Sequence, residues 1–245
     1  MVDLFSFGEN RLAASVTREP NAVEQHRMVE VEALNVTPES SGMRFKAPLR
    51  LPKLRQLVLR NCQQSLLEML TIDSLKQLDY LILYHSPDNL VDVVRIQDFP
   101  ELKKLTVRQQ FLDAVSKEWI CRHQNLTHLA LPETNACDAT IQNLNCKQTL
   151  QRLDLFRSEV AFEDQQLRQS VFPELSSLDV SETRVSGASI EIIHILFPRL
   201  GRLLAEQTSL TEVDVRQISL WKGLKILSTG YPAVDFDHHQ QTFWP

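Results

Sequence analysis

The chain of 245 residues contains only six glycines. Loops that cradle phosphate groups depend on glycine, because glycine lets the backbone approach a ligand closely and adopt positive φ angles. The patterns GxxxxGK[ST], GxSxG, HExxH and HRD, which mark nucleotide binding, ester hydrolysis, zinc peptidases and protein kinases, are also absent from the sequence. No motif therefore indicates catalysis, and we expect a protein that is not an enzyme and needs no cofactor.

Long apolar runs and an excess of positive charge are lacking as well. No stretch of 18 apolar residues occurs, so we expect no transmembrane helix. The opening MVDLFSFGENRLAAS has no basic start and no long apolar core, so we expect no signal peptide. The net charge is −5 and the isoelectric point is about 5.8, which argues against a general nucleic-acid surface. The expected location is cytoplasmic or nuclear.

Cysteine is scarce and does not follow the spacing of a metal site. The four cysteines are Cys62, Cys121, Cys137 and Cys146, and none of them forms a C-x-x-C pair. His238 and His239 could bind a metal, but adjacent histidines in a polar tail are more often simply solvated. Asp179 and Asp214 are expected to be strand or loop carboxylates without an evident partner. We therefore expect no metal site.

A repeat of constant length fills most of the chain. The frame L-x-x-L-x-L/V fits LRQLVLRNC and LDYLILYHS well and fits VEALNVT more loosely. Its nine copies begin at residues 31, 54, 78, 102, 126, 150, 175, 200 and 224, with steps of 23 to 25 residues. Chance spacing of a common residue would not hold one period through nine copies, so the sequence is a repeat array.

The period and frame resemble the leucine-rich-repeat superfamily, whose repeats span about 20–29 residues. The resemblance implies an α/β solenoid, or horseshoe, with a parallel sheet on the concave face and helices on the convex face. Secreted members usually carry paired cysteines at their ends, which this chain lacks. One departure lies at the ninth position, where the family has asparagine. Here the position holds Cys62, Ser86, Gln110, Thr134, Ser158, Thr183 and Thr208, whose side chains must bond more weakly or differently.

The segments between the leucine frames carry a helical period. We expect helices over 65–76, 89–96, 111–120 and 188–197, with Ser186 as a helix cap. In the third of these, the apolar residues are Phe111, Leu112, Val115, Trp119 and Ile120. Segments 137–148 and 161–170 show no clear helical pattern. FPEL at 99–102 and 172–175, FPRL at 197–200 and LPKL at 51–54 should end helices and plug the core between repeats.

Both ends differ from the repeats, as capping segments must. We expect an N-terminal cap over residues 1–30, about nine repeats over 31–230, and a C-terminal capping tail over 231–245. Phe236, Phe243 and Trp244 would cover the exposed end of the core. A short linear motif in this tail is the alternative.

Strand residues that do not enter the core should line the concave groove, at the third, fifth and seventh positions of each frame. In the first half of the chain these positions are rich in tyrosine, arginine and lysine, which are frequent binding hot spots. We expect them to bind a protein partner that carries acidic and apolar groups; a solvated face without a partner is the alternative. The candidate residues are Arg60, Tyr80, Tyr84, Lys104, Arg108, Arg152 and Phe156.

One repeat carries a finer resemblance. LSSLDVSETRVSGASIEIIHILFPRLGRL is similar to a repeat of the zyg-type ubiquitin-ligase receptors, with their L-D-[IV]-S-x-T core. That resemblance implies a substrate-recognition subunit that works with a cullin scaffold, although residues 1–30 contain no F-box and no clear elongin-binding box. We therefore expect a non-catalytic scaffold or adaptor, with a ubiquitin-ligase receptor as the first candidate. A structural subunit of a nuclear or cytoskeletal complex is the alternative, nucleic-acid binding comes third, and an enzyme comes last.

Overall fold

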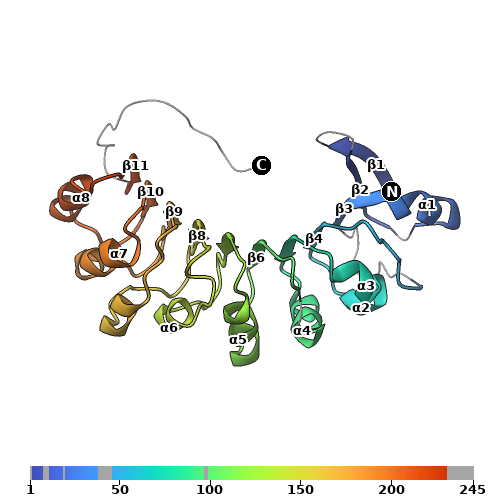
Figure 1. Cartoon of the computed structure of the whole chain (residues 1–245), viewed down its shortest axis with the longest axis horizontal. Helices are drawn as coiled ribbons and strands as arrows, with labels where there is room; N and C mark the ends of the chain where they lie inside the picture. The colour runs from blue at the N-terminus through green and yellow to red at the C-terminus, as the bar shows by residue number, and fades with distance from the viewer. Residues whose placement is uncertain (1, 8–10, 19, 38–45, 97–98, 231–245) are drawn as a thin grey trace.

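The computed structural model describes residues 2–7, 11–18, 20–37, 46–96 and 99–230, and they form one curved solenoid (Figure 1). Its strands are β1 (Val2–Phe7), β2 (Arg11–Val16), β3 (Val31–Val36), β4 (Gln56–Arg60), β5 (Tyr80–Tyr84), β6 (Lys104–Arg108), β7 (His128–Ala130), β8 (Arg152–Asp154), β9 (Ser177–Asp179), β10 (Arg202–Leu204) and β11 (Ile226–Ser228). They form one sheet in chain order, with β1 and β2 antiparallel and every later pair parallel. The predicted parallel sheet on the concave face is confirmed.

Helices line the convex side, as expected (Figure 1). They are α1 (Ala22–Arg27), α2 (Leu66–Met69), α3 (Ile72–Leu75), α4 (Pro87–Ile96), α5 (Ala114–Arg122), α6 (Asp138–Gln142), α7 (Ile190–Leu196) and α8 (Glu212–Ser219). Three short 3₁₀ helices join them: η1 (Met28–Glu30), η2 (Gln165–Gln169) and η3 (Gly187–Ser189). Each repeat therefore contributes one strand to the inner face, and most contribute a helix to the outer face.

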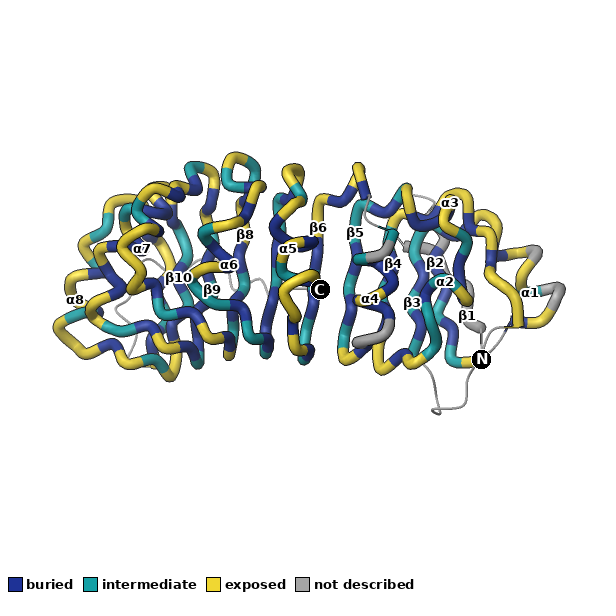
Figure 2. Tube along the Cα trace, turned by 90° about the horizontal axis from the view of Figure 1, so that it is seen from below, coloured by how far each residue is buried: buried dark blue, intermediate teal, exposed yellow. Residues whose placement is uncertain are grey.

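The leucine frame builds the core because strand side chains alternate between the two faces of the sheet. On β5, Leu81 and Leu83 are fully buried while the three residues around them remain partly exposed. The parallel register places Leu57, Leu81 and Leu105 side by side on neighbouring strands. The same leucine position continues through β11, so one apolar row runs along the parallel strands from β4 to β11; Figure 2 shows buried residues along this part of the solenoid.

The four proline motifs plug the core as predicted. Leu51, Phe99, Phe172 and Phe197 precede the prolines and are buried. The Phe172 and Phe197 rings lie 5.5 Å apart between centroids, and the Phe99 ring meets Trp119 edge-on at 6.0 Å. These aromatic contacts fill the space between successive repeats.

The ninth positions do not form a ladder of side chains. The Thr134, Thr183 and Thr208 hydroxyls each donate to the carbonyl oxygen three residues earlier in their own repeat, at 2.8, 2.5 and 2.8 Å. By contrast, the Cys62 backbone N–H donates to the Ser86 hydroxyl of the next repeat at 3.1 Å. Hydrogen bonds within each repeat thus mainly take the place of the hydrogen bonds that asparagine would make at this position.

Two of the predicted helices, over 65–76 and 111–120, differ from the structure in their bounds. The segment 65–76 divides into α2 and α3 because the backbone is extended at Leu70, where the chain on either side bonds to Leu49. In the next case, α5 begins only after Asp113, whose carboxylate caps the helix through the Ser116 N–H. Phe111 therefore precedes the helix and is 79% exposed, and Val115 points outward at 58% exposure.

Ser186 caps a helix as predicted, with its hydroxyl accepting from the Ala188 N–H. Asp214 is not on a strand or loop: it lies in the first turn of α8 and forms a capping box with Thr211. The pattern TEVDVRQ is a helix start, because its threonine and aspartate satisfy each other's backbone N–H groups.

The turn after each strand uses a left-handed residue that is not glycine. The eighth frame position has φ angles between 47° and 56° in seven repeats, at Asn61, His85, Gln109, Glu133, Arg157, Glu182 and Gln207. This conformation costs a non-glycine residue about 1–2 kcal/mol, and a β-branched residue more. The turn is therefore imposed by the packing of the repeat.

This geometry makes the exposed Gln207 a test position, because its φ is 53°. We expect Gln207→Val to lower the free energy of unfolding by about 1 kcal/mol, whereas Gln207→Gly leaves it unchanged or raises it slightly. Urea denaturation of the two variants measures the difference. Equal stability of the valine and glycine variants would contradict a left-handed turn.

The predicted C-terminal cap, with Phe236, Phe243 and Trp244, and the histidine pair 238–239 lie outside the described residues. The N-terminal segment contains the hairpin β1–β2, which continues the sheet past the first repeat. This hairpin fits the expected cap over residues 1–30, and we keep both cap boundaries as proposals.

Candidate concave binding surface

The outward-pointing strand residues form three rows across the concave face, one for each of the third, fifth and seventh frame positions. Strand register aligns each row: Tyr80 pairs with Lys104, Lys104 with His128, and His128 with Arg152 along the third-position row. Neighbouring strands are about 4.8 Å apart, so residues of one row are direct neighbours. The term concave surface is used below for the residues of these three rows on β4–β9, including the row residues that lie just after the end of a strand.

Aromatic and cationic side chains gather on β4–β6. The Tyr84 ring lies between Arg60 and Arg108, whose guanidinium carbons are 5.8 and 5.3 Å from its centroid. In the third-position row, the Lys104 ammonium lies 5.6 Å from the centre of the Tyr80 ring. Partial burial raises the pKa of Tyr80. Five of the seven predicted residues are therefore brought together in two stacked groups.

The other two predicted residues lie further along the sheet. Arg152 is on β8, beyond His128, and Phe156 follows the same strand two residues after Asp154. The Phe156 ring stacks under the guanidinium of Arg157 at 5.2 Å. These residues extend the surface but do not join the Tyr84 group.

His128 belongs to this surface, although it was not among the predicted binding residues. Burial, together with the positive charges of Lys104 and Arg152, lowers its pKa to about 4. The imidazole is therefore neutral at pH 7. Its position in the third row is visible in the sequence, but its partial burial is not.

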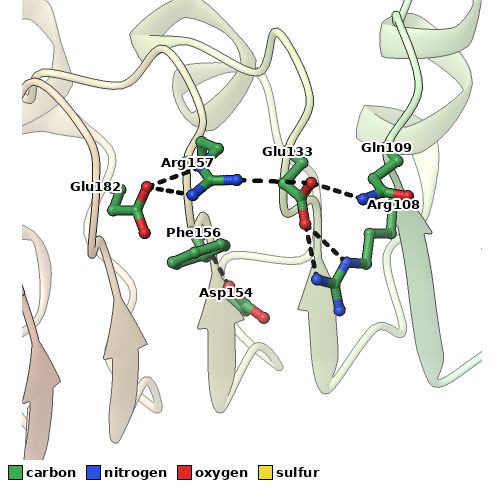
Figure 3. Close-up of polar contacts among 7 residues, drawn as sticks. All are labelled: Arg108, Gln109, Glu133, Asp154, Phe156, Arg157 and Glu182. Carbon is green, nitrogen blue, oxygen red and sulfur yellow. Dashed lines mark hydrogen bonds and ion pairs between the residues drawn. The ribbon is translucent and has the colours of Figure 1, made fainter.

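A ladder of ion pairs runs along the edge of the surface (Figure 3). Glu133 accepts hydrogen bonds from Arg108 Nη2 at 2.7 Å and from Gln109 Nε2 at 2.8 Å. Arg157 lies 4.0 Å from Glu133 and 2.6 Å from Glu182. Hydrogen bonds from Gln109 and Arg108 lower the pKa of Glu133. Arg108 thus already has an anionic partner within the protein, which the sequence prediction missed.

An acidic pair lies on β8 and β9. Asp154 and Asp179 are register partners in the fifth-position row, and each Oδ1 accepts the backbone N–H two residues later at 2.9 Å, from Phe156 and Ser181. Burial, together with the neighbouring charge of Asp179, raises the pKa of Asp154 to about 6. Asp179 therefore has a neighbour that was not evident in the sequence.

This raised pKa predicts a pH-dependent stability. The carboxyl group has a pKa near 3.9 in an unfolded chain and about 6 in the fold, so the folded state holds its proton more tightly. Stability from this group is present at low pH and is lost as the pH rises through about 6. We expect Asp154→Asn, which retains the acceptor for Phe156, to raise stability by about 2–3 kcal/mol at pH 7 and by about 0.5 kcal/mol at pH 4. Thermal unfolding at both pH values measures this, and an equal gain at both would contradict it.

The cysteines lie away from the concave surface. Burial raises the pKa of Cys121 to about 11 and that of Cys146 to about 12, so both are protonated thiols at pH 7. Cys121 and Cys137 border a groove between α5 and α6 on the convex side. Within the described ranges, no three His, Cys, Asp or Glu side chains are arranged to hold a metal ion.

Among the helices of the described residues, none is both long enough and apolar enough to cross a membrane.

Taken together, the sheet, the buried leucine rows and the outer helices define a leucine-rich-repeat solenoid. Among solved structures, the chain is similar to an internalin, InlF, from Listeria monocytogenes, with 14% identity and a TM-score of 0.50, over 87% of this chain and 72% of that one. It is also similar to the plant peptide hormone receptor RGFR1, solved in complex with RGF2, with 14% identity and a TM-score of 0.45. That match covers 93% of this chain but only 40% of the receptor. No family model and no curated protein matches the sequence.

Proposed function

We propose that the chain is a non-catalytic scaffold or adaptor that binds a protein partner on its concave surface. The observation that carries this proposal is the stacked group on β4–β6, where Tyr84 lies between Arg60 and Arg108. Stacking holds these long side chains in place before a partner arrives, which reduces the entropy lost on binding. Tyrosine and arginine supply much of the binding energy at protein interfaces.

The finer role that we propose first is substrate recognition for a ubiquitin ligase; a structural subunit of a larger nuclear or cytoskeletal complex is the alternative. Support for the first comes only from the L-D-V-S-E-T stretch. Its Leu178, Val180 and Thr183 are buried in the repeat core, so the fold alone already accounts for these residue types. Partner identification is therefore the decisive observation.

The test is affinity purification of the tagged protein from its own cells, followed by mass spectrometry. The variant combines Arg60→Glu, Tyr84→Ala and Lys104→Glu, and it spares Arg108 because that residue is paired with Glu133. The matched control carries Lys76→Glu and Lys222→Glu, two exposed residues outside the concave surface. We expect one set of partners to be lost with the concave variant and kept with the control, while thermal unfolding shows both folded. Partners that survive the concave variant would contradict this proposal.

A further inference from the structure

We propose that the concave surface binds an extended peptide segment of its partner that carries one acidic and one basic residue, the acidic one over β6–β7 and the basic one over β8–β9. This inference rests on the proposed function and specifies the chemistry of the partner. It follows from the unequal distribution of charge across the surface.

The cationic half is built on β4–β7. Arg60 and Lys104 are exposed cations on their strands, and His128 lies next to Lys104 in register. An anion above Lys104 and His128 would also meet the positive charge of Arg152 on the next strand. An acidic side chain of the partner fits here because Lys104 and Arg152 lie on either side of the neutral His128 along the third-position row.

The acidic half is built on β8–β9. Asp154 and Asp179 each use one oxygen, Oδ1, to accept a backbone N–H, at 2.9 Å in both cases. Within the described part of the chain, neither carboxylate forms a salt bridge with a basic side chain. Arg108 and Arg157 form their ion pairs with Glu133 and Glu182, although the charge of Arg108 still acts on Asp154 from a distance. A lysine or arginine from the partner would relieve the repulsion within this acidic pair.

Between the third- and seventh-position rows, the fifth-position row is uncharged from β4 to β7. Val58, Ile82, Thr106 and Ala130 follow one another in register along the fifth-position row from β4 to β7. A peptide backbone can approach closely over such residues, and an apolar side chain of the partner can pack on Val58 and Ile82. This row therefore favours a partner segment in an extended conformation that runs across the strands.

The strand spacing sets the distance between the two charges of the ligand. The midpoint of β6–β7 and the midpoint of β8–β9 are two strands apart, or about 10 Å. An extended chain covers that distance in about three residues, and a polyproline helix does so in the same number. The partner segment should therefore carry its acidic and basic residues about two to four positions apart.

The probe for this inference is a positional-scanning library of acetylated, amidated octapeptides, tested against the full-length protein. We expect selected peptides to contain one acidic and one basic residue at that separation. The selected peptide is then labelled, and its affinity is measured by fluorescence anisotropy. Asp154→Asn with Asp179→Asn should weaken binding about tenfold and remove the preference for the basic residue only. Lys104→Gln should remove the preference for the acidic residue only.

The matched control is Glu159→Gln with Glu174→Gln, which removes two exposed carboxylates outside the acidic pair and should leave the affinity unchanged. Selection of peptides without a charge preference, or equal affinity of the Asp154 and Asp179 variant for peptides with and without the basic residue, would overturn the inference. Failure to select any peptide would overturn it too. The partner purification described above separates the cases: if the concave variant still loses its partners, only this inference has failed, and if it keeps them, the proposed function has failed as well.

Discussion

Replacing Phe197 by alanine is expected to lower the free energy of unfolding by about 3–5 kcal/mol, because the change removes a fully buried ring and leaves a cavity. Phe197 is 1% exposed and packs against Phe172 at 5.5 Å and edge-on against Phe162 at 5.9 Å. The three rings join successive repeats on the convex side of the core. The loss should therefore weaken a contact between repeats as well as one within a repeat.

Urea denaturation measures the change, with tryptophan fluorescence as one probe. Trp221 lies near α7, with its ring 4.8 Å from His194, so it reports on the repeats next to Phe197. The control is Phe111→Ala, which removes the same group from a position that is 79% exposed and should change stability by less than about 0.5 kcal/mol. If both variants were equally stable, the role of the FPRL phenylalanine as a core plug would be wrong.

The Asp138→Ala variant is expected to lose about 2–4 kcal/mol, because one carboxylate serves a whole loop of the next repeat. Its Oδ1 accepts the N–H groups of Ala161 and Phe162 at 2.9 Å each, and its Oδ2 accepts those of Glu163 and Asp164 at 3.0 and 3.3 Å. Phe162 has a φ of 52° and a buried ring. The carboxylate therefore holds a strained turn in the segment where the outer element is the 3₁₀ helix η2 and not an α-helix.

Circular dichroism and urea denaturation test this role. Asp138→Asn keeps one acceptor oxygen and should lose an intermediate amount, while Glu159→Ala removes an exposed carboxylate nearby and should lose little. Because the loop carries Phe162 into the aromatic cluster, we expect Asp138→Ala combined with Phe197→Ala to cost less than the sum of the two single changes. Full additivity would show that the loop and the cluster are independent.

Most of the fold could be predicted from the leucine frame because its physical basis is local. Alternation of buried and exposed residues along each strand, together with a constant period, determines both the sheet and its register. The proline motifs also predicted their buried phenylalanines. The start of α5 was misplaced because apolar residues at 111 and 115 fit a helical period, whereas Asp113 caps the helix two residues after Phe111.

The concave surface was predicted only in part. The rows could be predicted from the frame, and with them the neighbourhood of Tyr80 and Lys104 in one row and of Tyr84 and Arg108 in another. Glu133 was missed because the eighth position lies in the turn and not on the strand. A signal was nevertheless present, since Glu133, Arg157 and Glu182 alternate in charge at that position of three successive repeats. The pKa values of His128 and Asp154 depend on burial by neighbouring strands, which no local pattern reveals.

A solenoid can bend along its length, because each repeat contacts only its neighbours and small rotations between successive repeats add up. The chain of contacts from Arg108 through Glu133 and Arg157 to Glu182 ties together the repeats of β6 to β9 along one edge. These are the strands that carry both the His128 row and the acidic pair. These edge contacts resist bending between the repeats of β6 to β9. The distance between the cationic half and the acidic half of the concave surface is therefore fixed before a ligand binds.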